Sequence, residues 1–344
     1  MDISDFDYVL PEELIAQVPL EERDASRMLV VDRKNHTWSD SHFPTFTQHL
    51  RSTDLVVINN TRVIPARLIG RRTPSGGRVE ILLVRELEPS VWEGLVRPGA
   101  RLKRGSIVDF NEGKLTAEIL DEPGKELRQV KFYCEGSFGN ILEDIGLTPL
   151  PPYIKRASGV SSQDRERYQT IFSRNPGAIA APTAGLHFSP RMLDEVRTCA
   201  RIAEITLHVG YGTFEPVRVS DIRQHSVSSE KLQITEAAAE LVNETQKEGG
   251  RIIAIGTTTM RALESASTEQ GKLLAGDSDA RLTITPGYVF RIADALLTNF
   301  HLPRSSLMLL VSAFAGRNLV LEAYRHAVKE RYRFYSYGDC MLIL

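Results

Sequence analysis

The chain has 344 residues, 42% of them hydrophobic, so it is long enough to bury more than one core, and two domains are expected. Its net charge of −2 at pH 7 argues against a protein that coats nucleic acid indiscriminately, because neutralising phosphates takes a concentrated excess of Lys and Arg. The apolar stretches 307–315 and 178–181 are far shorter than the roughly 18 residues that span a bilayer, so no membrane span is expected.

The three cysteines, Cys134, Cys199 and Cys340, have neither a CxxC partner nor histidines at zinc-site spacing. They predict free thiols in a reducing compartment. Residues 1–6 are acidic and lack the basic and apolar regions of a secretory signal peptide. We therefore expect a cytoplasmic protein, and because no histidine pair has HExxH or another metal spacing we expect no metal.

The apolar run 54–58 predicts a buried strand that ends in the polar cluster 59–62. From about 68 to 134 the pattern changes to short β-rich runs separated by Gly, Pro and Asn, which predicts a small barrel or sandwich. Strands are expected there at 79–84, 106–110 and 130–133. Between 66 and 104, nine basic residues stand against four glutamates, which fits either a phosphate-binding surface or an ordinary solvated face.

Mixed α/β patterning resumes after the β-rich region. Ser189 and Thr235 are expected helix caps, for helices from 190 to about 197 and from 236 to about 247. A strand at 251–256, a helix from about 260 to 270 and a final helix from about 319 to 331 follow. The chain is therefore expected to be α/β, with a mixed α/β catalytic domain formed by 1–66 and 148–344 and interrupted by an inserted small β-barrel domain at 67–147.

The segment 180–188, Ala-Ala-Pro-Thr-Ala-Gly-Leu-His-Phe, leads from an apolar strand to the helix start at Ser189. A strand-to-helix turn is where α/β folds hold ligands, and small residues such as Gly185 let a ligand approach the backbone. Thr183 offers a hydroxyl and His187 a group that titrates near neutral pH. The alternative is that His187 is a structural histidine packed between its apolar neighbours.

A second cluster, 207–216, contains Gly-x-Gly but not the full GxGxxG fingerprint, so a dinucleotide site is not expected. His208 then belongs either to a site or to a strand that ends in a turn. In the segment 256–261, the hydroxyls of Thr257 and Thr258 lie at a helix start, where a carboxylate or phosphate binds well, although simple capping explains them equally.

A fourth cluster brings Asn299, Phe300 and His301 together, shortly after Tyr288 in the chain. Such groups hydrogen-bond a nucleic-acid base and stack on it. Equally, the aromatic side chains fit a hydrophobic core.

Several long motifs resemble those of the S-adenosylmethionine:tRNA ribosyltransferase-isomerase family, in the same order and from the first residues to the last. These motifs are 7–8 to 19–20 with 23–27, 59–67, 181–188, 208–210, 212–214, 298–303 and 332–339. The resemblance implies an α/β domain with an inserted β-barrel. It also implies a metal-free transfer of the ribosyl group of S-adenosylmethionine, the co-substrate, to 7-aminomethyl-7-deazaguanine at the wobble position of tRNA. Adenine and methionine leave, and epoxyqueuosine tRNA remains.

This implied chemistry needs a general base, because a C–H bond next to a sulfonium is unusually acidic. The candidates are His187, His208 and His301. Candidates for binding the substrates are Asn60, Arg62, Thr183, Gly185, Thr257, Thr258, Tyr288, Asn299, Phe300 and Asp339. The sulfonium also favours an aromatic face, from Tyr288, Phe300 or Phe214. The expected partner is tRNA that carries the modified base, and a monomer is the expected state.

The chain departs from the implied pattern at several positions. Gln224 stands in place of an acidic residue and Ser228 in place of a second histidine, and Tyr211, Met260 and Thr285 are milder departures. Two alternatives stay open. The first is a divergent relative that uses S-adenosylmethionine but modifies another acceptor. The second is a non-catalytic protein that binds tRNA through the basic barrel, with strong salt dependence and no consumption of S-adenosylmethionine.

Overall fold

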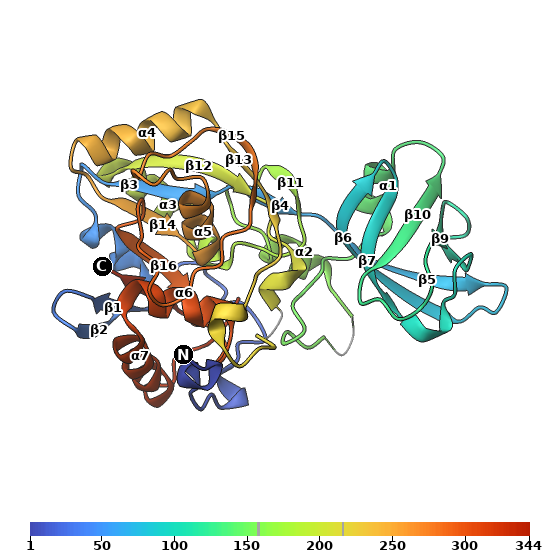
Figure 1. Ribbon diagram of the computed structural model, residues 1–344, viewed down its shortest axis with the longest axis horizontal. Coiled ribbons are helices and arrows are strands. Elements are labelled where there is room, and N and C mark those ends of the chain that lie inside the picture. The colour runs from blue at the N-terminus through green and yellow to red at the C-terminus, as the bar shows by residue number, and fades with distance from the viewer. Residues whose placement is uncertain (157–158, 215–216) are drawn as a thin grey trace. The chain divides into compact units, whose positions relative to one another are not determined.

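The computed structural model describes residues 1–156, 159–214 and 217–344 (Figure 1). The chain forms two compact units, a larger one of residues 1–62, 151–155 and 169–344 and a smaller one of residues 63–150 and 156–168. The expected fold class, mixed α/β with a β-barrel, is confirmed. These units differ from the predicted domain ranges chiefly in residues 156–168, which belong to the smaller unit.

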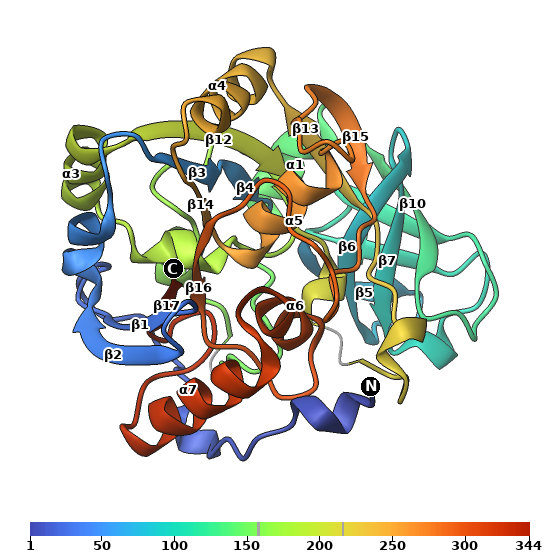
Figure 2. The ribbon, with the colours of Figure 1, turned by 60° about the vertical axis from the view of Figure 1, so that its left-hand side comes forward.

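The larger unit contains a mixed sheet whose described strands follow the order β15-β13-β12-β3-β14-β16-β17-β1-β2 (Figure 2). These strands are β1 Arg27–Asp32, β2 Thr37–His42, β3 Leu55–Asn59, β12 Arg201–Leu207, β13 Glu230–Ile234, β14 Ile252–Ile255, β15 Gly276–Ala280, β16 Ala295–Asn299 and β17 Cys340–Ile343. At its centre, β3 and β16 each run parallel to β14. All residues of these three strands are buried, as expected for strands covered on both faces.

Successive side chains of a strand point to opposite faces, and the core follows this alternation. Leu55 and Val57 join one apolar cluster, which includes residues of helices α4 to α7. Val56 and Ile58 join a second cluster, which includes residues of α3. The sheet is therefore covered by helices on both faces.

The helices of the larger unit are α3 Pro190–Cys199, α4 Glu236–Lys247, α5 Thr257–Ser265, α6 Ser306–Ala315 and α7 Arg317–Lys329. The caps predicted at Ser189 and Thr235 are confirmed, since each side chain accepts a hydrogen bond from an N–H of the first turn. The predicted bounds of α5, 260–270, are wrong. Gly256, with φ of 95°, turns the chain directly out of β14, so Thr257 and Thr258 lie in the first helical turn.

Membrane-span criteria are not met by any single helix of the described residues. Only α6 and α7 taken together are long and apolar enough to cross a membrane, and the chain bends by 115° between them.

The smaller unit contains a barrel that is closed by its described strands in the order β10-β7-β6-β5-β8-β9. Its elements are β5 Arg67–Thr73, β6 Arg78–Glu88, β7 Val91–Arg97, β8 Ile107–Phe110, β9 Leu115–Ile119, β10 Arg128–Cys134, α1 Phe138–Ile145 and α2 Ser162–Arg167. The three strands predicted from the β-rich pattern are confirmed as β6, β8 and β10. The short strands β4 Thr61–Val63 and β11 Asn175–Ala178 pair in a separate sheet.

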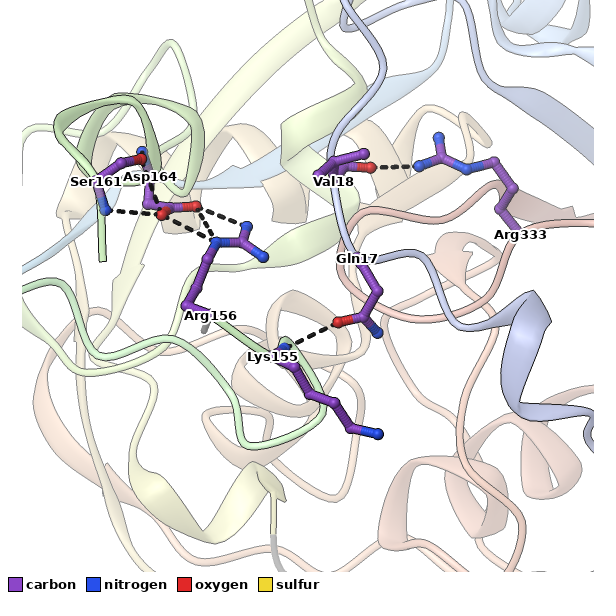
Figure 3. A network of polar contacts seen from close by, with 7 residues as sticks. All are labelled: Gln17, Val18, Lys155, Arg156, Ser161, Asp164 and Arg333. Carbon is purple, nitrogen blue, oxygen red and sulfur yellow. Dashed lines mark hydrogen bonds and ion pairs between the residues drawn. The ribbon is translucent and has the colours of Figure 1, made fainter. Parts of the chain in front are cut away.

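Polar contacts anchor the chain inside each unit where it passes from residue 155 to 156 (Figure 3). In the larger unit, the N–H of Lys155 donates to Oε1 of Gln17 at 2.8 Å. In the smaller unit, the guanidinium of Arg156 forms an ion pair with Asp164 at 2.7 Å, and the N–H of Ser161 donates to the same carboxylate at 3.0 Å. Each side of this crossing is thus fixed by contacts within its own unit.

Candidate functional site

A cavity in the larger unit, the first cavity, lies at the carboxyl ends of β14 and β16. These strands are parallel, so their ends meet at one edge of the sheet, which is where α/β folds bind ligands. The empty space in this cavity is about 650 Å³, which includes open solvent. The lining residues are Tyr153, Ala181, Thr183, Ala184, Gly256, Thr257, Thr258, Thr298, Asn299, Phe300, His301, Leu302, Ser305, Leu307, Tyr335 and Ser336.

Three buried polar atoms of the first cavity have no hydrogen-bond partner among the described residues. They are Oδ1 of Asn299, Oγ1 of Thr258 and the hydroxyl oxygen of Tyr335. Their residues are only 3%, 9% and 6% exposed. An unsatisfied buried polar group costs about 1–3 kcal/mol, so three of them around one cavity indicate groups that are reserved for a polar ligand.

His301 is the one sequence-selected histidine that lines the first cavity in the described part of the chain. Its Nε2 lies 2.9 Å from Oγ1 of Thr298, and Nδ1 has no hydrogen-bond partner among the described residues. Its backbone N–H donates to the hydroxyl of Tyr324 at 3.1 Å, and the hydroxyl of Tyr8 donates to its carbonyl. Burial lowers the pKa of His301 to about 3, so its ring is neutral at pH 7.

His187 lies behind Asn299 and does not line the first cavity in the described structure. Its Nδ1 is 2.8 Å from Oγ of Ser26, and its Nε2 is 3.2 Å from Nδ2 of Asn299. Burial, with a further effect of the positive charge of Arg333, lowers the pKa of His187 to about 4. A neutral ring with both nitrogens engaged holds Asn299 in place.

His208 lies outside the first cavity, at the end of β12, as far as the described residues go. Its Nδ1 is 2.8 Å from Oγ1 of Thr61, and burial lowers its pKa. Gly177 makes room for the ring, because a Cβ there would lie 2.7 Å from Cε1 of His208. The three candidate bases are thus in three different environments.

Asn60 and Arg62 are also placed away from the first cavity. The Oδ1 atom of Asn60 accepts a hydrogen bond from the hydroxyl of Thr206 at 2.7 Å, and its Nδ2 donates to Glu204 at 3.0 Å. Arg62 is exposed. Both ends of the Asn60 amide thus have partners within the protein.

Asp339 and Tyr288 form hydrogen bonds within the larger unit. The carboxylate of Asp339 accepts hydrogen bonds from the N–H groups of Arg27 and Arg333 at 2.9 and 2.8 Å, and burial raises its pKa. The hydroxyl of Tyr288 donates to Glu264 at 3.0 Å. Neither side chain lines the first cavity in the described structure.

Gly185 and Phe300 contribute packing. A Cβ at Gly185 would meet side-chain atoms of Phe172 and Thr170 at 2.7 and 2.8 Å, so only glycine fits. Phe300 is completely buried and packs edge-on against Tyr324. Phe300 lines the first cavity, whereas the side chain of Phe214 lies outside the described part of the structure.

A second cavity adjoins the first, because Thr257, Thr258 and Leu307 line both. The guanidinium of Arg261, on α5, lines it and forms an ion pair with Glu230, on β13. The other lining residues are Gly212, Val227, Ser228, Leu282, Thr283, Ile284, Ser306 and Leu310. Ser228, which stands where the family pattern has a second histidine, therefore lies at this cavity.

Several lining residues were not selected from the sequence. Tyr335 and Ser336 belong to the family motif 332–339. This motif could have identified them, although neither was chosen as a site residue. Arg261 follows Thr257 by four residues, one helical turn, so helix spacing would have found it. Nothing local marks Tyr153 or Glu230, which come from distant parts of the chain.

Two loops at one end of the barrel, called here the basic loops, span 71–78 and 97–104. They contain seven Arg and Lys residues and no acidic residue. The guanidinium of Arg72 donates to the carbonyl of Arg101 at 3.0 Å, so the two loops adjoin. None of the seven forms an ion pair with a described residue, whereas the other two basic residues of 66–104, Arg67 and Arg85, pair with glutamates.

No group of three or more His, Cys, Asp or Glu side chains is suitably placed for a metal ion in the described ranges. The polar groups that line the two cavities are hydroxyl, amide, imidazole, guanidinium and carboxylate groups.

Comparison with known proteins covers nearly the whole chain. Residues 3–343 match the family described as queuosine biosynthesis protein. A protein of Pelotomaculum thermopropionicum named S-adenosylmethionine:tRNA ribosyltransferase-isomerase is 50% identical over 345 residues, 100% of both chains. Relatives of the same name from Desulforamulus reducens and Natranaerobius thermophilus are each 46% identical, and the match covers 100% of this chain and 100% and 99% of theirs.

A solved structure of similar fold is described as S-adenosylmethionine tRNA ribosyltransferase from Thermotoga maritima. It is 36% identical in sequence, with a TM-score of 0.55, and the match covers 99% of this chain and 100% of that one. The likeness therefore extends over the sequence of both units.

Proposed function

This chain belongs to the S-adenosylmethionine:tRNA ribosyltransferase-isomerase family of queuosine biosynthesis, and we propose that its first cavity binds S-adenosylmethionine. The enzyme transfers and isomerises the ribosyl group of S-adenosylmethionine onto 7-aminomethyl-7-deazaguanine in the tRNA wobble position, giving epoxyqueuosine tRNA, adenine and methionine. The observation that carries the placement is the convergence of three buried, unpartnered polar atoms on this cavity.

These atoms suit the nucleoside part of the ligand. The amide oxygen of Asn299 is an acceptor, which an exocyclic amine or a ribose hydroxyl satisfies. The hydroxyls of Thr258 and Tyr335 both donate and accept, so each can bind a ribose hydroxyl or a ring nitrogen. Thr183, Thr257 and Phe300 complete this part of the lining.

In this proposal His301 carries the proton transfers. Its Nδ1 takes the proton from the carbon beside the sulfonium, the C–H bond breaks, and the electron pair stays on carbon. The protonated ring then gives this proton to the departing adenine. His187 acts as a positioning residue for Asn299, and His208 has no part in the proposed proton path.

The basic loops of the barrel are proposed to bind the phosphate backbone of tRNA. Seven cationic side chains without an ion-pair partner among the described residues concentrate positive charge on a chain whose net charge is −2. Phosphate contacts release condensed counterions and so give strong, salt-dependent binding. Base recognition stays with the larger unit in this proposal.

The cytoplasm and a monomeric state are proposed as well. All three cysteines are free, which suits a reducing compartment. Exposed large hydrophobic side chains occur in both units, for example Val9 and Val289 in the larger and Leu87 in the smaller, and single side chains of this kind are normal on a monomer. Light scattering coupled to size-exclusion chromatography would test the monomer, and fractionation of the source cells would test the compartment.

The variants Tyr335→Phe and Thr258→Val test the placement of S-adenosylmethionine. Each removes an oxygen that has no partner in the described structure, so the free energy of unfolding should stay the same or rise slightly. Each should raise the KM for S-adenosylmethionine about 3- to 10-fold, as expected when one hydrogen bond to the ligand is removed. The assay is release of adenine and methionine with tRNA bearing 7-aminomethyl-7-deazaguanine, together with the mass of the modified nucleoside.

Ser312→Ala is the matched control. Its hydroxyl is likewise buried and without a described partner, but it lies in α6 and lines neither cavity in the described structure. Ser312→Ala should change neither the free energy of unfolding nor the KM for S-adenosylmethionine. Unchanged KM values in both cavity variants would refute the placement.

A further inference from the structure

The second cavity holds a buried cation and a buried anion side by side. The side chains of Arg261 and Glu230 are only 11% and 4% exposed. Oε1 of Glu230 accepts a hydrogen bond from the N–H of Gly210 at 2.7 Å, and Oε2, which forms the ion pair with Arg261, has no hydrogen-bond partner among the described residues. Taking two charges out of water costs several kcal/mol per ion, so the pair is weak evidence for stability alone. Binding a ligand would give the buried pair a role other than stability.

The guanidinium of Arg261 has donors to spare. It carries five N–H groups, and its only partner among the described residues is Glu230. Burial lowers the pKa of Arg261 to about 10, so the group is still a cation at pH 7. The remaining donors are thus available to an anion in the cavity that Arg261 lines.

The start of α5 adds to this anion site. Thr257 and Thr258 lie in the first turn of a helix of nine residues, where backbone N–H groups and the helix dipole favour a carboxylate. Independently, Oγ1 of Thr258, a residue 9% exposed, lacks a partner in the described structure and borders both cavities. A ligand that extends from the first cavity passes these threonines to reach Arg261.

We propose that the second cavity binds the α-amino-carboxylate end of S-adenosylmethionine, with Arg261 on the carboxylate and Glu230 on the ammonium. A paired cation and anion in one cavity match a zwitterion, and an Arg–carboxylate contact is among the stronger hydrogen-bonded pairs. This inference rests on the proposed placement of the nucleoside in the first cavity. It assigns to Arg261 and Glu230 the recognition of a sulfonium ligand that still carries its amino acid.

The experiment compares S-adenosylmethionine with decarboxylated S-adenosylmethionine, which lacks only the carboxylate. Equilibrium dialysis with radiolabelled S-adenosylmethionine and the decarboxylated compound as competitor gives the ratio of their dissociation constants. Unmodified tRNA is present, so no turnover occurs. The wild-type protein should prefer S-adenosylmethionine about 10- to 100-fold, the range of a hydrogen bond to a charged group.

The double variant Arg261→Gln with Glu230→Gln should bring this ratio within about 3-fold of unity. It removes both charges together, so no unpaired buried ion is left to unfold the protein, and a melting curve checks the fold. Arg261→Lys, which keeps a cation, should retain part of the preference. A ratio near one in the wild type, or an unchanged ratio in the double variant, would overturn the inference.

The test of the second cavity can fail independently of the test of the first. If Tyr335→Phe and Thr258→Val leave S-adenosylmethionine affinity unchanged, the nucleoside placement fails whatever the carboxylate ratio is. If those variants weaken binding but the ratio does not depend on Arg261, only the present inference fails.

Discussion

Nδ2 of Asn299 lies 3.2 Å from Nε2 of His187 and 3.0 Å from the carbonyl oxygen of Tyr335. Both contacts require an amide donor, so Oδ1 is the atom left for the first cavity. The ring of His187 is fixed in turn by Ser26 at 2.8 Å. The direction of a ligand-facing oxygen is therefore set by a histidine that does not line the first cavity in the described structure.

Replacing His187 should release Asn299. We expect His187→Ala to raise the KM for S-adenosylmethionine about tenfold with a smaller change in kcat, because the substitution removes a positioning hydrogen bond and not a reacting group. His187→Gln, whose amide oxygen can accept from Nδ2, should restore part of the affinity. Steady-state kinetics measure both constants. A kcat that falls 100-fold at constant KM would show that His187 has a chemical role and not a positioning role.

The burial of His187 should also make stability depend on pH. Its pKa is about 4 in the folded protein against an ordinary value of 6.5, so between these values the unfolded chain binds a proton that the folded chain does not. The free energy of unfolding should fall as the pH drops from about 6.5 to 4, by about 3 kcal/mol from this group. Urea denaturation at pH 7 and 4.5 should show a smaller loss for His187→Gln, and equal losses would contradict the assignment.

Substitutions of His301 and His208 should have different effects on kcat. His301→Gln should lower kcat about 100-fold or more, because the variant has no group that accepts and donates the proton. His208→Gln should leave kcat within about 3-fold of the wild type, since His208 lines neither cavity in the described structure. The reverse pattern in single-turnover assays would move the proton transfer to His208.

Neutralising the basic loops should affect tRNA and not S-adenosylmethionine. For the triple variant Arg72→Gln, Arg101→Gln and Arg104→Gln we expect weaker tRNA binding, and a salt dependence whose slope falls by about 1 for each phosphate that the variant no longer binds. Filter binding between 50 and 300 mM salt measures both, and the KM for S-adenosylmethionine at saturating tRNA should stay constant.

Lys114→Gln is the control for this experiment. Lys114 is exposed in the turn after β8, and the pairing of Arg71 with Asp109 and Thr73 with Ile107 places that turn at the opposite end of the barrel. A control that weakens tRNA binding as much as the triple variant would mean that the loops have no special part in binding.

The sequence predicted the elements that depend on local pattern. Apolar runs located β3 and β14, and Ser189 and Thr235 located the starts of α3 and α4. The start of α5 was missed by three residues, because threonines are poor helix formers and the turn at Gly256 that places them in the helix is a property of the backbone.

The candidate site was predictable only in part for a similar reason. Thr183, Thr257, Thr258, Asn299, Phe300 and His301 all line the first cavity. Asp339 satisfies backbone N–H groups, and an aspartate with that task looks the same in a sequence as one that binds a ligand. The pairing of Glu230 with Arg261 depends on tertiary structure, which no local pattern contains.

Strand β17 follows every other described strand in the chain, yet it lies between β16 and β1 in the sheet. The hairpin of β1 and β2 joins the sheet only through β17, so on the ribosome it waits with an open edge until residues 340–343 have been made. The barrel strands, all within 67–134, meet no such delay. The barrel can therefore close early in synthesis, whereas the sheet is complete only when β17 pairs, and until then the open edge of the hairpin is exposed to aggregation.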